Sequence, residues 1–313
     1  MNMNSMKHKK LNILLTGGSG FIGRNLIELL GKKYNIFAPT HKELELLDAE
    51  AVNAYVQSKK IDIIIHTANK GGGRDTRNMM NVVEYNTRMF FNLTRNSQFV
   101  KKMIHLGSGA EYDKKRDLKK IKENDFDKYV PSDDYGFVKY ICSKYIEKSD
   151  NIINLRLFAV YGKYENYRYK FISNAIVKNL FSIPITVNQN VYFDFLYIDD
   201  LIRIIEYFIN NKNKYNIYNC TRGIAIDLIS LVNIINEISD NPSEIIIINK
   251  GLNKEYSANN SRLLDELGKF KFTTYKSAIK YLFKFYKSII NKIDIKEIEE
   301  DKYIKYCRVN KNE

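Results

Sequence analysis

Cysteine and proline are scarce in this chain of 313 residues, and long apolar runs are missing. The three cysteines, Cys142, Cys220 and Cys307, are odd in number and have neither CxxC nor metal-ligand spacing. They predict free thiols in a reducing compartment and exclude a disulfide framework, and no metal site is expected. No apolar run reaches the roughly 18 residues that span a bilayer, so we expect a cytoplasmic protein without a membrane partner.

Positive charge is in excess, with 50 Lys and Arg against 36 Asp and Glu and a formal net charge of +14. A basic field attracts nucleic acids, anionic membranes and acidic ligands alike. The lysines are spread along the chain among many Asn, Ile, Tyr and Phe residues, which is typical of a general compositional bias. We therefore expect no nucleic-acid partner. A hydrophobic content of 44% is enough for a substantial core, which excludes disorder as the dominant state.

Short apolar runs alternate with helical patterns over the first half of the chain. LNILLT at 11–16 predicts a strand, and the segment after it has apolar residues at helical spacing. Further strands are expected at 35–40, 61–68, 101–108 and 151–160. Continuously apolar strands that alternate with helices indicate an α/β fold, a Rossmann-type doubly wound parallel sheet covered on both faces.

The pattern becomes less regular after Val160, which predicts a smaller C-terminal substrate-binding lobe. The expected dinucleotide-binding Rossmann domain comprises residues 11–161 and about 192–222. The expected lobe, with a helical tail, comprises about 162–191 and 223–313. No Pro-rich or Gly/Ser-rich linker separates them, so the two parts are expected to be integrated.

A glycine-rich turn follows the first predicted strand. Gly17, Gly20 and Gly23 form GxxGxxG at the start of a helix. Glycines allow a pyrophosphate to approach the backbone, and the helix N-terminus supplies free N–H groups and a positive dipole end. The second strand ends in IFAPTHKEL, with neither Asp nor Arg where a ribose 2′ group is usually read. His41 and Lys42 could receive a 2′-phosphate or be simply exposed, so NAD(H) and NADP(H) both stay open.

A second set of residues suits proton transfer. Tyr135 and Lys139 in YGFVK are four apart and share one helix face. A nearby ammonium favours the phenolate and lowers the pKa of a tyrosine from about 10. Ser108 follows a strand, at the sheet edge where ligands gather, and its hydroxyl can hold a reacting oxygen. Together with the glycine turn, these three catalytic candidates predict hydride exchange with an alcohol or ketone.

These motifs carry a family resemblance. TGGSGFIG, the HTA at 66–68, Ser108 and YGFVK resemble the extended short-chain dehydrogenase/reductase family, the NAD-dependent epimerase/dehydratases that act on nucleotide sugars, over about residues 11–267. THKELELLDAEAV and NKGGG are most similar to GDP-fucose synthase and related GDP-4-keto-sugar reductases. The resemblance implies a nucleotide-sugar substrate, hydride exchange at C4, proton transfer by Tyr135, a role in surface polysaccharide biosynthesis and a homodimer.

The resemblance also implies which residues bind each ligand. Cofactor contacts are expected from Gly17, Gly20, Phe21, Ile22, Gly23, His41, Thr67, Ala68, Asn86, Tyr135 and Lys139. Substrate contacts are expected from Lys70, Gly72, Ser108, Gly109, Arg168, Lys170 and Arg262. Some of these have an equally good structural interpretation: Asn86 could serve as a helix cap or core residue, and the three cations could be solvated surface charges.

Two departures from the family pattern narrow the expected reaction. GDP-fucose synthase also epimerises carbons beside the ketone, with a cysteine just after the catalytic serine and a histidine in the substrate lobe. This chain has Ala110 in place of the cysteine and no histidine from Gly162 to Val191. Alanine exchanges no proton, so we expect redox chemistry at C4 without epimerisation at C3 or C5. Phe193 replaces the family's diphosphate-contacting arginine.

Three other functions stay open at this point. A C4 epimerase with tightly bound NAD would use the same catalytic residues. A 4,6-dehydratase would carry an acidic residue beside the serine and then a second carboxylate; Gly109 and Ala110 argue against it, although Glu111 is acidic. A non-enzymatic NAD(P)-binding sensor or structural relative would have a broken catalytic set, whereas Ser108, Tyr135 and Lys139 are all present.

Overall fold

The computed structural model describes residues 9–76 and 79–307. Its centre is a six-stranded sheet in which every neighbouring pair is parallel. The strand order is β11-β6-β4-β3-β1-β2. The strands are β1 (Asn12–Thr16), β2 (Asn35–Phe37), β3 (Ile63–His66), β4 (Lys102–Ser108), β6 (Ile152–Leu157) and β11 (Ile217–Cys220).

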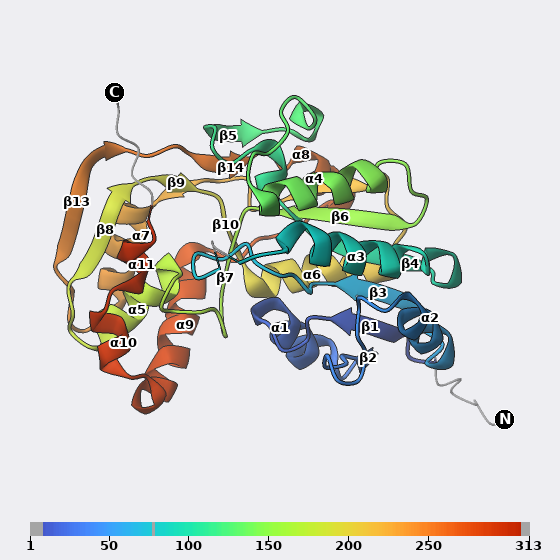
Figure 1. Ribbon diagram of the computed structural model, residues 1–313. Coiled ribbons are helices and arrows are strands. Elements are labelled where there is room, and N and C mark those ends of the chain that lie inside the picture. Colours follow the sequence, from blue (N-terminus) through green and yellow to red (C-terminus); the bar gives the residue numbers. More distant parts are fainter. Residues whose placement is uncertain (1–8, 77–78, 308–313) are drawn as a thin grey trace.

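Helices cover both faces of this sheet (Figure 1). Alternate residues of one strand enter opposite cores, so Ile13 lies in one hydrophobic cluster and Leu14 in the other. The first core receives α1 (Phe21–Leu30) and α6 (Ile198–Asn210). The second receives α2 (Ala49–Ser58), α3 (Val82–Thr94) and α4 (Asp134–Ile146). The predicted doubly wound α/β fold is confirmed.

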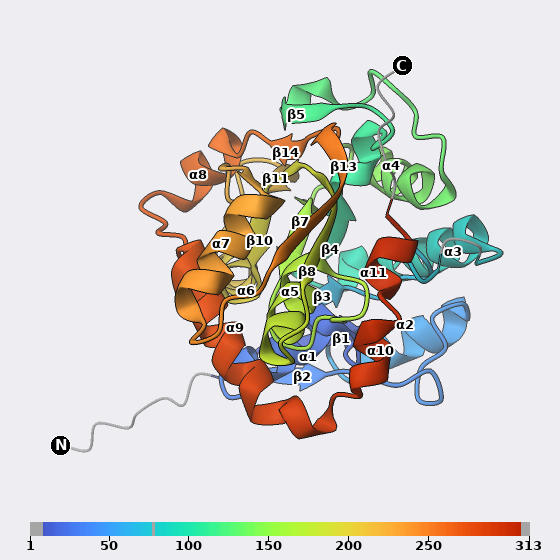
Figure 2. The ribbon, with the colours of Figure 1, turned by 90° about the vertical axis from the view of Figure 1, so that its left-hand side faces the viewer.

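A second lobe lies beside the carboxyl edge of the sheet (Figure 1). The strands outside the central sheet form three small sheets, one of which pairs β8 with β13 in parallel. These strands are β5 (Leu118–Ile121), β7 (Ala159–Tyr161), β8 (Ile185–Asn190), β9 (Tyr192–Phe193), β10 (Phe195–Tyr197), β12 (Ile226–Asp227), β13 (Ile245–Leu252) and β14 (Tyr256–Ala258). The remaining α-helices are α5 (Phe171–Leu180), α7 (Leu228–Ile238), α8 (Ser261–Leu267), α9 (Tyr275–Ile289), α10 (Ile295–Glu299) and α11 (Lys302–Lys305). Figure 2 shows β8 and β13 side by side, with the red α10 and α11 near α5.

Short 3-10 helices connect some of these elements: η1 (Ser97–Phe99), η2 (Gly109–Tyr112), η3 (Glu123–Asp125) and η4 (Ile290–Lys292). One pairing joins segments far apart in the sequence. β5 lies within the residues assigned to the Rossmann domain, yet it pairs with β14 of the second lobe. The expected strand at 151–160 is also divided, because β6 ends at Leu157 and β7 pairs with β10. The two lobes are thus joined by backbone hydrogen bonds.

The three cysteines are free thiols, as expected; Cys142 and Cys220 are buried. Within the described ranges, no helix is long and apolar enough to cross a membrane. Nor do the described residues include a cluster of three or more His, Cys, Asp or Glu side chains arranged to hold a metal ion.

Candidate active site

The glycine turn lies between the carboxyl end of β1 and α1, and two of its glycines are sterically required. Gly17 has φ +74°, and a Cβ there would lie 2.7 Å from the Ala68 nitrogen and the Thr67 Oγ1. A Cβ on Gly23 would lie 2.2 Å from the Gly17 carbonyl oxygen. At Gly20, by contrast, the same oxygen would be 3.3 Å away and is the nearest described neighbour.

The first turn of α1 suits a pyrophosphate. Gly20 is its N-cap, and no side chain caps the free N–H groups that follow at residues 21–23. No acidic side chain stands in this turn, so the positive end of the helix dipole is not compensated there. The turn therefore fits the diphosphate of a dinucleotide, with the backbone, not a charged side chain, as the donor.

The neighbouring strand supports this turn. The Thr67 hydroxyl donates to the Thr16 carbonyl oxygen at 2.7 Å, and the Ala68 N–H donates to the Thr16 Oγ1 at 3.3 Å. Thr67 and Ala68 thereby hold the end of β3 against the end of β1. Both residues were expected to contact the cofactor, and this placement at the glycine turn agrees with that expectation. His41 is exposed in the turn after β2, and its contact with a 2′ group stays a prediction.

Ser108 is the last residue of β4 and the N-cap of η2. Its Oγ accepts the Ala110 N–H at 3.1 Å, while the Ser108 N–H donates to Glu111 Oε1 at 2.9 Å. This reciprocal capping box fixes the serine side chain at the carboxyl edge of the sheet. The side chain also interacts with the hydroxyls of Tyr135 and Tyr256.

Tyr135 lies in the first turn of α4, and Lys139 lies one turn later on the same face. The Lys139 ammonium is buried and donates to the Leu106 carbonyl oxygen at 2.7 Å, and its Nζ lies 5.8 Å from the centre of the Tyr135 ring. The structure thus brings Ser108, Tyr135 and Lys139 together at one edge of the sheet. The helix is positioned by Gly136, where a Cβ would lie 2.8 Å from the Ala110 carbonyl oxygen.

The acidity of these side chains differs from the sequence expectation. Burial raises the pKa of Tyr135 to about 12, against an opposing hydrogen bond with Ser108. Burial likewise lowers the pKa of Lys139. The expected lowering of the tyrosine pKa by Lys139 is thus not found. Desolvation has the largest effect on Tyr135, and the Lys139 ammonium donates to the Leu106 carbonyl oxygen. Tyr135 is therefore a neutral proton donor at pH 7 in this arrangement.

Tyr256, which belongs to β14 in the second lobe, was not among the residues predicted for the site. Its hydroxyl lies 2.7 Å from the position that a Cβ on Gly109 would take, and its ring centre lies 4.8 Å from that of Phe158, with the two rings tilted by 44°. Burial raises its pKa, so it too is a neutral hydroxyl. β14 reaches this place because it pairs with β9 and β5. No local motif marks Tyr256, because only the pairing of remote strands delivers it.

The expected substrate contacts in the loop after β3 lie beside the catalytic tyrosine. Gly72 has φ +85° and packs on the Tyr135 ring. The Lys70 ammonium lies 3.5 Å from the centre of the Tyr85 ring. Asn86 holds the loop, because its amide accepts the Lys70 N–H and donates to the Lys70 carbonyl oxygen, each at 2.8 Å. These hydrogen bonds give Asn86 a structural role in holding the loop. Its contact with the cofactor stays a prediction.

The three predicted cations of the second lobe are in different situations. Arg168 pairs with Glu297 at 2.6 Å and Arg262 donates to the Ile217 carbonyl oxygen and to Asn124, so both are engaged within the protein. Lys170 is exposed at the N-cap of α5. Phe193, in place of an arginine, pairs with Ile226 and packs on Phe195. The diphosphate contacts of all three cations stay predictions, and Lys170 has the most accessible charge.

A model of the NAD dependent epimerase/dehydratase family matches residues 13–221. The chain belongs to this family. That range includes the glycine turn, Ser108, Tyr135 and Lys139, the residues on which the sequence resemblance rested. The residues around the turn fit a dinucleotide, as the crowding at Gly17 and Gly23 and the uncapped N-terminus of α1 show. NAD(H) or NADP(H) is accordingly the cofactor class.

Individual relatives carry out different reactions on nucleotide sugars. An ADP-L-glycero-D-manno-heptose-6-epimerase from Brachyspira hyodysenteriae is 25% identical over 72% of this chain and 80% of its own length. A GDP-6-deoxy-D-talose 4-dehydrogenase from Aggregatibacter actinomycetemcomitans is 26% identical over 88% and 97%. The structure of a GDP-mannoheptose C4 reductase from Campylobacter jejuni with NADP bound superposes with a TM-score of 0.76, at 22% identity over 89% of this chain and 98% of that one. These comparisons support a nucleotide-sugar enzyme and leave the choice between epimerase, dehydrogenase and reductase to the site itself.

Proposed function

We propose that this protein is an NAD(P)-dependent oxidoreductase that acts at C4 of a nucleotide sugar, a GDP-linked hexose or heptose, in surface polysaccharide biosynthesis. The observation that carries the proposal is the convergence of the Ser108, Tyr135 and Lys139 side chains at the carboxyl edge of the sheet, the edge at which the glycine turn follows β1. The GDP-sugar C4 dehydrogenase and reductase among its relatives favour the same substrate class.

The side chains divide the work in a simple way. The Ser108 hydroxyl hydrogen-bonds the oxygen on C4 and orients it. The neutral Tyr135 hydroxyl donates a proton to this oxygen in ketone reduction and takes it back in alcohol oxidation. The buried Lys139 ammonium, whose Nζ lies 5.8 Å from the centre of the Tyr135 ring, contributes positive charge on the same helix face as the phenolate that forms. When bound, the nicotinamide exchanges a hydride with C4.

Two absences argue against epimerisation at the neighbouring carbons. Ala110, at 1% exposure, has only a methyl group beside Ser108. The four histidines of the chain are His8, His41, His66 and His105, and none belongs to the second lobe. His66 and His105 are buried side by side on β3 and β4, which lowers the pKa of both. No acid–base side chain of the expected kind thus serves C3 or C5.

The test is turnover of purified protein followed at 340 nm. A GDP-4-keto-hexose with NADPH or NADH measures reduction, and 4-hydroxy GDP-hexoses and GDP-heptoses with NADP or NAD measure oxidation. We expect turnover in one direction. In Tyr135→Phe the turnover rate should fall about 10³-fold, because phenylalanine lacks the hydroxyl that transfers the proton. No change in absorbance with any of these substrates would refute the proposal.

A C4 epimerase is the second candidate, because it would use the same three catalytic residues and because a UDP-glucose 4-epimerase shares this fold, with a TM-score of 0.75. It would interconvert the C4 stereoisomers of the substrate without net cofactor consumption. Proton NMR of the product therefore separates the two functions. If the wild-type protein bound NAD(P) but converted no sugar in either assay, a non-enzymatic NAD(P)-binding role would replace both enzymatic functions.

A homodimer is part of the proposal. α3 and α4 expose aromatic side chains, among them Phe91, Phe137 and Tyr145, with exposed fractions of 36%, 37% and 42%. The rings of Phe91 and Tyr145 lie 5.4 Å apart, so they form one apolar patch across the two helices. A second copy would cover this patch. Light scattering should give the mass of two chains, and Tyr145→Lys should shift it to one.

A further inference from the structure

A buried carboxylate lies directly behind Ser108. Glu111 has no exposed surface and stands three residues after the serine, on η2. Its Oε1 accepts the Ser108 N–H at 2.9 Å, and its Oε2 accepts the Arg156 Nε–H at 2.5 Å. Arg156, on β6, is equally buried. The ion pair is thus one hydrogen bond away from the catalytic serine.

The guanidinium of Arg156 extends the network to the helix of the catalytic tyrosine. It donates to the Ser143 Oγ at 2.8 Å and to the Tyr112 hydroxyl at 2.7 Å. Ser143 belongs to α4, one turn beyond Lys139. The Asn154 amide, also on β6, donates to both the Glu111 carboxylate and the Ser143 Oγ. One charged pair therefore connects the Ser108 turn with the helix that carries Tyr135 and Lys139.

The backbone is shaped around this carboxylate. A Cβ at Gly107 would lie 2.4 Å from Glu111 Oε1 and 2.1 Å from the Asn154 Oδ1, so any larger residue would displace the network. On the other side of η2, the Ala110 carbonyl oxygen lies against Gly136, next to Tyr135. η2 thus packs between the Ser108 backbone and the first turn of α4, which carries Tyr135. Its position depends on the carboxylate that caps it.

Stability alone does not account for such a pair. Two charges that lose their hydration gain little net stability over well-packed apolar residues of the same volume. They do impose a defined geometry, since each bond has a direction and a length. The Glu111–Arg156 pair is hydrogen-bonded to the Ser108 N–H and to Ser143 of α4. It therefore contributes to the relative placement of Ser108 and α4 at the catalytic edge of the sheet.

We propose that Glu111, held by Arg156, is a positioning residue that sets the Ser108 hydroxyl relative to Tyr135 for the C4 reaction. This inference rests on the proposed function. Glu111 touches neither reacting atom and acts through the Ser108 N–H and through η2. Arg156 compensates the negative charge of the Glu111 carboxylate by an ion pair and holds Oε2 of that carboxylate on the side of α4.

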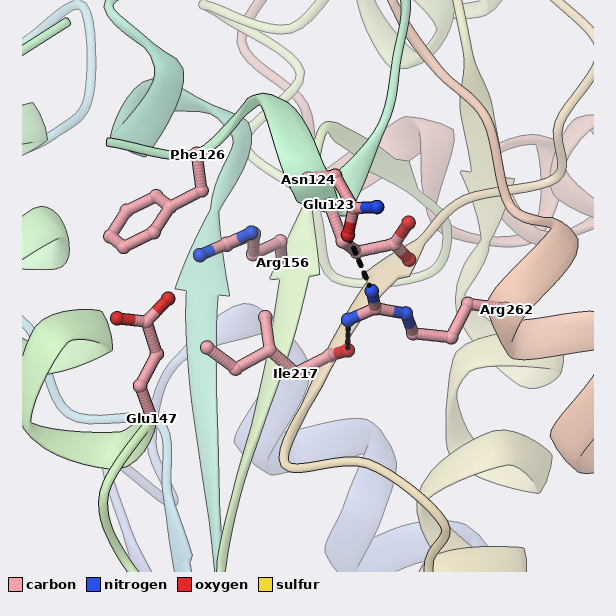
Figure 3. A pocket seen from close by; sticks show the side chains of 7 residues that line it. All are labelled: Glu123, Asn124, Phe126, Glu147, Arg156, Ile217 and Arg262. Carbon is pink, nitrogen blue, oxygen red and sulfur yellow. Dashed lines mark hydrogen bonds between the residues drawn. The ribbon is translucent and has the colours of Figure 1, made fainter. Parts of the chain in front are cut away.

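A cavity beside Arg156 gives the proposal a sharp test (Figure 3). It has a volume of about 370 Å³ and is lined by Glu123, Asn124, Phe126, Glu147, Arg156, Ile217 and Arg262. Figure 3 shows Arg156 between Phe126 and Glu147, and its guanidinium lies 4.2 Å from the centre of the Phe126 ring. Because Arg156 lines this cavity and contacts Glu111, its truncation to alanine would leave the space of its own guanidinium group between the cavity and Glu111.

The first experiment compares two isosteric variants. Glu111→Gln keeps the shape and an acceptor for the Ser108 N–H but removes the charge that holds Arg156. We expect kcat to fall by about 10- to 100-fold, since small misplacements of reacting groups have effects of that size, while KM for the cofactor is unchanged. Glu123→Gln is the matched control, a buried carboxylate of the same cavity that accepts the Asn219 N–H and has no bond to Ser108. Equal kcat values in Glu111→Gln and wild type, or equal losses in both variants, would overturn the proposal.

The second experiment is chemical rescue. In Arg156→Ala, millimolar ethylguanidinium should restore activity at least about tenfold, because it can enter through the cavity and pair with Glu111. Ethylammonium, which lacks the planar fork, should restore less, and neither ion should restore Glu111→Gln. A folded Arg156→Ala protein that recovers no activity would overturn the role given to Arg156.

The third experiment reads positioning without turnover. Amide hydrogen exchange reports on the Ser108 N–H directly, because Glu111 is its acceptor. We expect faster exchange at residues 108–111 in Glu111→Gln, because an amide oxygen accepts more weakly than a carboxylate and is no longer held by an ion pair with Arg156, and unchanged exchange there in Glu123→Gln. If wild-type protein converts no nucleotide sugar, the proposed function fails while this measurement still decides the positioning. Unchanged exchange in Glu111→Gln would overturn it.

Discussion

The backbone of Gly72 packs against the ring of Tyr135. A Cβ added at Gly72 would be 2.5 Å from Cε2 and 2.6 Å from Cδ2 of that ring, closer than any van der Waals contact allows. The loop that follows β3 therefore touches the tyrosine expected to transfer the proton. Two hydrogen bonds between the Asn86 side chain on α3 and the Lys70 backbone hold this loop in position against the ring.

We predict that Gly72→Ala lowers kcat by at least about tenfold. The added methyl group must push either the loop or the tyrosine ring, and the ring bears the reacting hydroxyl. Steady-state kinetics should show this loss without a change in cofactor affinity. Gly251→Ala is the matched control, because Gly251 has a similar φ of +78° with nothing within 4 Å of its Cβ position. It carries the same backbone strain without the contact, so equal losses in both variants would contradict the explanation.

The glycine turn allows a second prediction, with opposite outcomes at two of its positions. Gly23→Ala should destabilise the fold, because its Cβ would lie 2.2 Å from the Gly17 carbonyl oxygen. Gly20→Ala should destabilise the fold much less, since its Cβ would lie 3.3 Å from the same oxygen and needs a shift of only a few tenths of an ångström. It should still bind the dinucleotide at least about tenfold more weakly, because the methyl group stands where the phosphates approach the backbone. Thermal unfolding with and without NAD(H) or NADP(H) measures both effects. A Gly20→Ala protein with unchanged cofactor stabilisation would refute the assignment of this turn.

The sequence predicted those parts of the site that have local signals. Gly17, Ser108, Tyr135 and Lys139 each stand in a recognisable strand, turn or helix, and the parallel sheet brings the ends of these elements to one edge. Tyr256 could not be predicted in this way, because β14 reaches Ser108 only by pairing with β9 and β5. Side-chain environments were equally out of reach. The pKa of Tyr135 depends on how deeply its hydroxyl is buried, which no spacing of residues reveals.

One signal for the Glu111–Arg156 pair was present in the sequence. Arg156 interrupts the apolar strand NIINLRLFAV, and Glu111 lies in a turn next to the catalytic serine. A charge in a strand that must be covered on both faces requires a partner of opposite sign. The partner itself was hidden, because β4 and β6 are adjacent in the sheet but distant along the chain.

Tyr256 supports a third prediction. Its hydroxyl interacts with the Ser108 side chain and belongs to the lobe opposite Tyr135. Tyr256→Phe removes this partner and nothing else, so we expect kcat to fall about three- to tenfold, the effect of one hydrogen bond. Tyr286→Phe is a suitable control, since the Tyr286 hydroxyl also makes an internal hydrogen bond, to the Glu165 carbonyl oxygen, but lies far from Ser108 in sequence and packs against α5. A Tyr256→Phe enzyme with wild-type kcat would show that the Ser108–Tyr256 contact has no part in the reaction.

Glu165 gives the last prediction, which concerns stability and pH. This side chain is buried behind α5, where its Oε2 accepts the Ser173 hydroxyl at 2.7 Å. Burial raises its pKa from 4.5 to about 7, although Lys170 and Arg74 act in the opposite direction. A raised carboxyl pKa means that the folded state binds this proton more tightly than the unfolded chain does. The resulting stabilisation is complete below pH 4.5 and is lost as the pH rises through 7.

Glu165→Gln should therefore remove one component of the pH dependence. A glutamine stays neutral at every pH, so the variant should gain stability over the wild type as the pH rises from 5 to 8, by at most about 3 kcal/mol. Urea unfolding at pH 5, 6, 7 and 8 measures this difference. Lys170→Met is the complementary variant: it removes a nearby positive charge, so the pKa of Glu165 should rise further and the loss of stability should move to higher pH. Parallel pH profiles for wild type and Glu165→Gln would contradict the assignment of the titration to this carboxyl.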